Sequence, residues 1–148
     1  MSVHVLGNVC ASQDHLTQSF GYHNRALAQY RATVGDKHHR TADLCSKVAD
    51  HYLRFRKATE AKLLLNQASL IYSSRDHFKQ ELVRTYALFA LLYLLLGGKG
   101  KRTEYQAKAM SLYRLLVPHD MRDDEDIGDT DFERIVCFAS RWTLMKVP

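Results

Sequence analysis

Helix-breaking residues are scarce in this sequence of 148 residues. It contains only two prolines, Pro118 and Pro148, and seven glycines. Proline removes a helical hydrogen bond, and glycine in a helix interior costs about 1 kcal/mol relative to alanine. Long stretches without either residue therefore favour helices, and the composition predicts an all-α fold.

Cysteine is also rare, with Cys10, Cys45 and Cys137 widely spaced and no CxxC pair. An odd, scattered set argues against a disulfide framework and fits a reducing compartment. The first residues show no basic stretch followed by an apolar run, so we expect no signal peptide. The longest apolar stretch, residues 86–96, is too short to span a bilayer. These features predict a cytoplasmic protein, with the nucleus as the alternative, and no membrane partner.

Motifs of catalysis and metal binding are missing from the sequence. It has no GxSxG, P-loop or GxGxxG motif. Its eight histidines form no HxxxH pair, and the adjacent His38 and His39 have no carboxylate at ligand spacing. The acid-rich run at 123–126 lacks the alternating ligands of a calcium loop. We therefore expect no enzyme activity, no cofactor and no metal ion.

Charge is distributed unevenly along the chain. Residues 1–116 contain 17 Lys/Arg and 8 Asp/Glu, whereas residues 117–148 contain 4 and 8. A basic body beside an acidic segment is compatible with nucleic-acid binding, an acidic partner or an intramolecular contact. A solvated helical surface is the simplest interpretation.

Small and aromatic residues recur with a period of 42 residues and then 41. The aligned sets are Ala26, Ala68 and Ala109; Tyr30, Tyr72 and Tyr113; Ala49 and Ala90; and Tyr52 and Tyr93. In helix–turn–helix units, helices approach closely where side chains are small, and large aromatic side chains fill the gaps between neighbouring units. The period therefore predicts a stack of helical hairpins.

The apolar spacing predicts helices over residues 3–12, 16–33, 40–55, 58–73, 77–96, 102–116 and 131–145. Asp76 and Asp131 are expected to act as N-caps, and Gly97-Gly98 can end the fifth helix. Residues 118–130 are expected to form a polar, partly mobile loop.

Two patterns carry a family resemblance. Small, aromatic and apolar residues have tetratricopeptide spacing in Leu6-Gly7-(x2)-Cys10 and, more closely, in Val48, Ala49, Tyr52, Ala61, Leu65 and Ala68. Residues 35–42 (GDKHHRTA) match the link between hairpins in the kinesin-light-chain-like subtype, with His39 in place of proline. The sequence thus resembles tetratricopeptide repeat proteins of that subtype and is similar to fungal arrays of such repeats.

The resemblance implies a right-handed α-α superhelix of about three hairpins and a C-terminal capping helix. The corresponding segments are 1–36, 40–75 and 77–116 for the repeats within 1–116, 117–130 for an acidic loop, and 131–148 for the cap. In this family the first helix of each hairpin lines a concave groove. The positions that face it correspond here to His4, Asn8, Asp43, Lys47, Asp50, Arg54, Arg84 and Leu91.

The resemblance implies a non-enzymatic scaffold that binds a peptide or a partner helix in this groove. An alternative is that Leu91, Leu94 and Leu95 instead pack under the C-terminal helix. A second functional hypothesis is a self-associating unit, a homodimer formed through an uncapped first helix. A third is a basic regulator that binds nucleic acid through the clusters near Arg54 and Arg102, which is disfavoured because cations at helix ends also serve the helix dipole.

Overall fold

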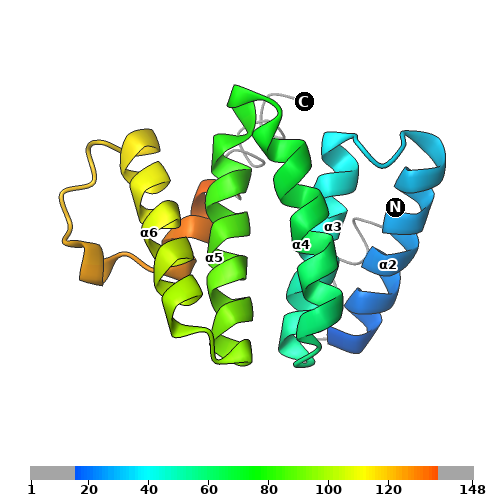
Figure 1. Cartoon of the computed structure of the whole chain (residues 1–148). Coiled ribbons are helices and arrows are strands. Elements are labelled where there is room, and N and C mark those ends of the chain that lie inside the picture. The colour runs from blue at the N-terminus through cyan, green and yellow to red at the C-terminus, as the bar shows by residue number, and fades with distance from the viewer. Residues whose placement is uncertain (1–15, 137–148) are drawn as a thin grey trace. The chain divides into compact units, whose positions relative to one another are not determined.

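Helices account for all regular secondary structure in residues 16–136, the part of the chain that the computed structural model describes (Figure 1). Their bounds are α2 (Leu16–Thr33), α3 (His39–Arg54), α4 (Ala58–Ser73), η1 (Asp76–Phe78), α5 (Lys79–Leu96), α6 (Lys99–Leu116) and η2 (Asp124–Asp126), and residues 129–136 are also helical. The all-α prediction is confirmed for this part of the chain. None of its helices has the length and apolarity needed to cross a membrane.

The chain divides into two compact units, with the border between Ser74 and Arg75. The first contains α2, α3 and α4, and the second contains α5, α6, the two short 3-10 helices and the helical residues 129–136. Each unit is described by itself below.

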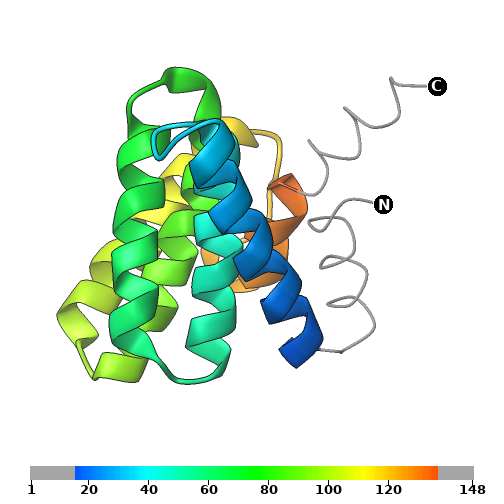
Figure 2. The ribbon, with the colours of Figure 1, turned by 90° about the vertical axis from the view of Figure 1, so that its right-hand side faces the viewer.

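In the first unit, α3 packs against both α2 and α4 (Figures 1 and 2). Ala49, Ala61 and Ala68 are completely buried, and alanine lets helix backbones approach closely. Leu65 and Tyr72 are completely buried as well and fill the space between the helices. Ala49, Ala68 and Tyr72 belong to the sets that the 42- and 41-residue shifts align, so these periodic positions lie in the core of the unit.

A tight turn connects α2 to α3. Gly35 adopts a left-handed backbone conformation with φ 92°, which glycine enters without steric cost. The Thr41 hydroxyl donates a hydrogen bond to the Gly35 carbonyl over 2.6 Å. His38 is the N-cap of α3, because its Nδ1 accepts the backbone N–H of Arg40 at 3.1 Å. The polar residues between the helices therefore shape the turn and start α3.

In the second unit, α5 and α6 form a hairpin (Figure 1). Gly97 ends α5 in the left-handed conformation with φ 75°, as predicted from the sequence. The ring of Tyr105 on α6 stacks between those of Phe89 and Tyr93 on α5, with centroid distances of 4.6 and 5.7 Å. The core of this unit is the cluster of Val83, Ala109, Tyr113, Ile127 and Phe132.

Helix starts in the second unit differ from the predictions. Asp76 does not cap α5: it opens a 3-10 turn, and α5 begins at Lys79 with Phe78 as an N-cap that makes no side-chain hydrogen bond. Helix α6 begins at Lys99 rather than at 102. Asp131 lies inside the first turn of the helix at 129–136, where its carboxylate accepts the Gly128 N–H at 3.0 Å. It thus supports the helix start from within rather than as the N-cap.

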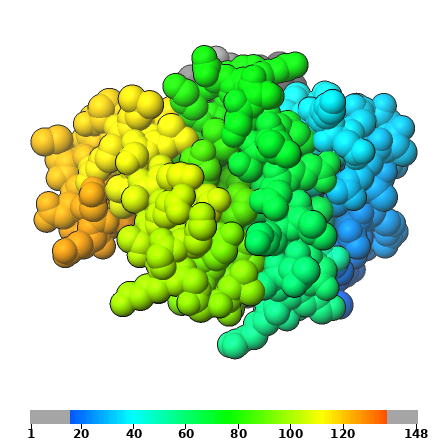
Figure 3. Space-filling model, in the orientation of Figure 1, coloured from blue at the N-terminus to red at the C-terminus, as the bar shows by residue number. Residues whose placement is uncertain are grey.

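The acid-rich segment (residues 118–128) makes several hydrogen bonds and ion pairs with α6. Arg114 of α6 binds the Asp124 carboxylate at 2.6 Å and the Asp120 carbonyl at 2.6 Å. The Tyr113 hydroxyl donates to the Asp120 carboxylate at 2.5 Å. In the space-filling view, the orange atoms of this segment lie directly against the yellow atoms of α6 (Figure 3). The sequence does not predict these contacts, because Arg114 meets Asp120 and Asp124 only when the segment folds back on α6, and helical periodicity says nothing about the path of a loop.

Candidate functional site

Four of the residues predicted to face a groove lie along one side of α3. Asp43, Lys47 and Asp50 are partly exposed and Arg54 is exposed, whereas most other positions of this helix are buried. Their spacing of three and four residues places them on a single helix face. The Arg54 guanidinium lies 3.4 Å from the Asp50 carboxylate, and the Tyr72 hydroxyl donates a hydrogen bond to Asp43. This face therefore has mixed charge.

The other predicted residues are not brought together with this face. His4 and Asn8 lie outside the described residues. Arg84 and Leu91 belong to α5 in the second unit. Arg84 is 8% exposed, and its Nη1 lies 3.8 Å from the Glu133 carboxylate, so it faces the helix at 129–136. Leu91, in contrast, is partly exposed and lines a pocket.

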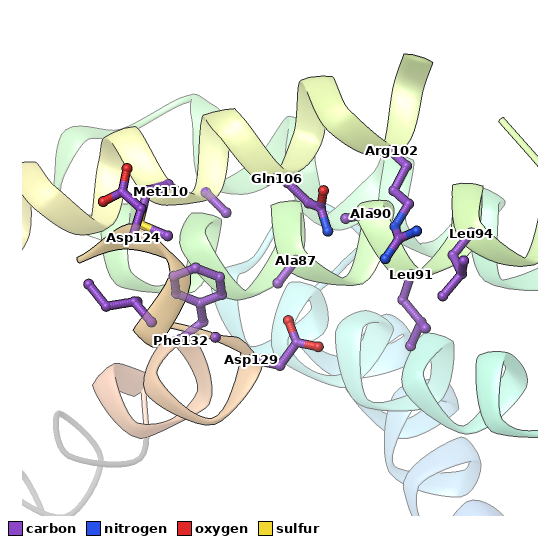
Figure 4. A pocket seen from close by; sticks show the side chains of 13 residues that line it. Ala87, Ala90, Leu91, Leu94, Arg102, Gln106, Met110, Asp124, Asp129 and Phe132 are labelled. Carbon is purple, nitrogen blue, oxygen red and sulfur yellow. The ribbon is translucent and has the colours of Figure 1, made fainter. Parts of the chain in front are cut away.

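The pocket has a volume of about 290 Å³ and lies within the second unit, between the α5–α6 hairpin and the residues that follow η2 (Figure 4). Three elements contribute its walls. The lining residues are Ala87, Ala90, Leu91 and Leu94 of α5; Arg102, Gln106, Ala109 and Met110 of α6; and Asp124, Ile127, Gly128, Asp129 and Phe132.

The pocket combines apolar walls with a few charged groups. Arg102 and Leu94 lie at one end, and Met110 and Asp124 lie at the other (Figure 4). Gln106 and Asp129 project between these ends from opposite walls (Figure 4). An apolar cavity with a small number of placed polar groups is typical of binding sites, and this set contains no nucleophile next to a base.

Ion pairs fix the wall that carries Asp124 and Phe132. Arg122 holds Asp120 through two hydrogen bonds of 2.7 and 3.0 Å, and it reaches the Asp131 carboxylate at 2.8 Å. The Arg122 hydrogen bonds hold the pKa of the Asp120 carboxyl far below its usual range. They also lower the pKa of Asp131, together with the N–H of Gly128. Because both pKa values are lowered, both carboxylates stay charged into acidic pH, where Arg122 still has its ion-pair partners.

Sequence reasoning missed most of this pocket. The sequence indicates Arg102 only as part of a basic cluster, and it assigns no site to Gln106, Asp129 or Phe132. Only Leu91 was among the predicted site residues. The sequence feature that could have indicated the pocket is the run of leucines near the end of α5. This run is longer than the core of the unit needs, since Leu94 and Leu95 remain 48% and 37% exposed.

A polar cluster lies between α2 and α3 in the first unit. Nδ1 of His23 and Nε2 of His51 are 2.9 Å apart, and the Ser19 hydroxyl oxygen is 3.3 Å from the His51 nitrogen. The exposed fractions of His23 and His51 are 2% and 5%, so substrate has no access to this serine and its histidines. Burial lowers the pKa of His51, which favours a neutral ring. The cluster therefore joins two helices rather than forming a catalytic pair.

Other reactive groups give no site either. Burial raises the pKa of the Cys45 thiol to about 11, so it stays protonated and unreactive at neutral pH. Within residues 16–136, no three histidine, cysteine or acidic side chains gather in a way that could hold a metal ion.

No protein-family model matches this sequence, and no curated protein matches it significantly.

Proposed function

We propose that the chain is a non-enzymatic scaffold of tetratricopeptide type, whose hairpins bind a peptide or a partner helix. Two pairs of sequential helices, α3–α4 and α5–α6, form the hairpins that such repeats require. The period of 42 and 41 residues and the burial of its small positions support this assignment.

One observation carries the binding function: three consecutive leucines at the end of α5 are exposed, and the first of them lines the pocket. The exposed fractions of Leu94, Leu95 and Leu96 are 48%, 37% and 52%. Leu94 also lines the pocket, next to Leu91. Runs of exposed apolar residues lower the solubility of a protein unless they serve a contact, so this surface favours a partner.

Site-specific photo-cross-linking in cells tests the proposal. A photoreactive residue replaces Leu95 in one variant and Leu115 in a matched control. Leu115 is 64% exposed on α6, outside the run of exposed leucines at 94–96. We expect a discrete cross-linked partner from position 95 and none from position 115. Equal products at both positions, or none at either, would contradict the proposal.

The same experiment separates the alternative of self-association. A product of twice the mass of the chain, together with concentration-dependent light scattering, would identify a second copy as the partner. The exposed leucines are equally compatible with that outcome, because homodimer interfaces are rich in apolar residues.

A further inference from the structure

We infer that the pocket of the second unit takes one apolar side chain from a mixed-charge peptide, with an acidic group next to Arg102 and a basic group next to Asp129. This inference rests on the proposed peptide-binding function and specifies the chemistry of the peptide. It follows from the size of the pocket and from the charged groups that remain unpaired around it.

The volume sets how much of a partner can enter. About 290 Å³ accommodates a large apolar side chain but not a whole helix. The surfaces contributed by Leu91, Leu94, Met110 and Phe132 are apolar, so an aliphatic or aromatic side chain is the group that gains most from entering.

Arg102 is the cation at one end of the pocket. Its side chain is partly buried, and no acidic side chain of residues 16–136 lies within ion-pair distance of it. Two cations of the same helix do find a partner: Lys101 and Lys108 both bind the Glu104 carboxylate at 3.4 Å. A carboxylate on the peptide would thus give the Arg102 guanidinium an ion-pair partner at this end of the pocket.

Asp129 supplies the opposite charge. It is exposed and has no cation within ion-pair distance in the described residues, although Asp124 is held by Arg114 and Asp131 by Arg122. A second acidic group on the peptide would meet this carboxylate and be repelled. A lysine or arginine is the group that fits this side of the pocket.

A double-mutant cycle with a designed peptide tests the inference. The probe is a short fluorescein-labelled helical peptide with one leucine flanked, one turn away on either side, by a glutamate and a lysine. Two further probes carry glutamine in place of the glutamate or of the lysine. Binding to the full chain is measured by fluorescence anisotropy.

We expect Arg102→Gln to weaken the charged probe about tenfold and to leave the probe without glutamate nearly unchanged. Asp129→Asn is expected to weaken the charged probe by a similar factor and to leave the probe without lysine nearly unchanged. Lys99→Gln is the matched control, because it removes an exposed cation from the start of the same helix without touching the pocket. This variant should bind all probes as the unchanged chain does.

The inference is overturned if the charged probe does not bind to the unchanged chain. It is also overturned if Arg102→Gln and the control Lys99→Gln weaken binding equally, or if Arg102→Gln and Asp129→Asn each reduce the affinity for all three probes by the same factor. Circular dichroism of each variant excludes unfolding as the cause. A cross-linked partner at position 95 would still stand after such a result, so failure of the charge pattern is distinguishable from failure of the scaffold function.

Discussion

Phe132 should be the residue that anchors the helix at 129–136 to the α5–α6 hairpin. It is 6% exposed, and its ring meets that of Tyr113 edge-on with a centroid distance of 5.6 Å. Replacing it with alanine removes about 2–3 kcal/mol of apolar burial. Loss of the aromatic pair adds about 1 kcal/mol. We therefore expect Phe132→Ala to lower the free energy of unfolding by about 3–4 kcal/mol, within the range seen for buried phenylalanines.

Urea unfolding followed by circular dichroism measures this change. Leu115→Ala is the control in the same unit, because its side chain is 64% exposed, and we expect a change below about 0.5 kcal/mol. The denaturant dependence should stay the same if only stability changes. A loss below about 1 kcal/mol for Phe132→Ala, with that dependence unchanged, would show that the helix is not anchored through this ring.

Three further predictions concern other parts of the chain. Since burial lowers the pKa of His51, the unfolded chain protonates this histidine more readily than the folded chain does, and the free energy of unfolding should fall as the pH drops below about 6.5. In urea titrations between neutral and mildly acidic pH, His51→Gln should make the free energy of unfolding less dependent on pH. Leu65→Ala removes a completely buried side chain and should cost about 2–5 kcal/mol in the same assay. Gly97→Ala should lower the free energy of unfolding by about 1 kcal/mol through its positive φ alone, whereas Gly100→Ala, inside α6, should raise it by a similar amount. Thermal unfolding of the two variants measures both changes, and equal effects would contradict the backbone argument.

The helices were predictable because local apolar spacing determines them. The predicted ranges 16–33 and 58–73 coincide with α2 and α4. The predicted bounds were wrong at the starts of α5 and α6, because the first residue of a helix depends on which residue caps it. Aspartate is a favoured N-cap residue, but Asp76 opens a 3-10 turn that ends at the buried Phe78, and α5 begins only at Lys79. The expected start at 102 overlooked that Gly98 can precede a helix when its carbonyl accepts the N–H of Arg102, here at 2.9 Å.

Contacts between residues distant in sequence could not be predicted. His23 and His51 lie on different helices, 28 residues apart in the sequence. Only the packing of α2 on α3 brings their rings together. The sequence drew attention instead to the adjacent His38 and His39, which stack at the start of α3. The pocket was missed for the same reason, because its walls come from three separate stretches of the chain. A periodic pattern specifies which face of a helix is buried, but it does not specify the partner.

The charge asymmetry of the sequence is explained in part by contacts inside the second unit. Arg114 of the basic body pairs with Asp124, and Arg84 lies 3.8 Å from Glu133. An intramolecular contact was one of the three interpretations that the charge distribution left open, and these pairs favour it over an acidic partner for the whole segment. Residues already joined in intramolecular ion pairs contribute little to the binding of a partner, because the partner would first have to break those pairs. For the proposed peptide binding, the charges without an ion-pair partner in the described residues are the ones expected to contribute, and at the pocket these are Arg102 and Asp129.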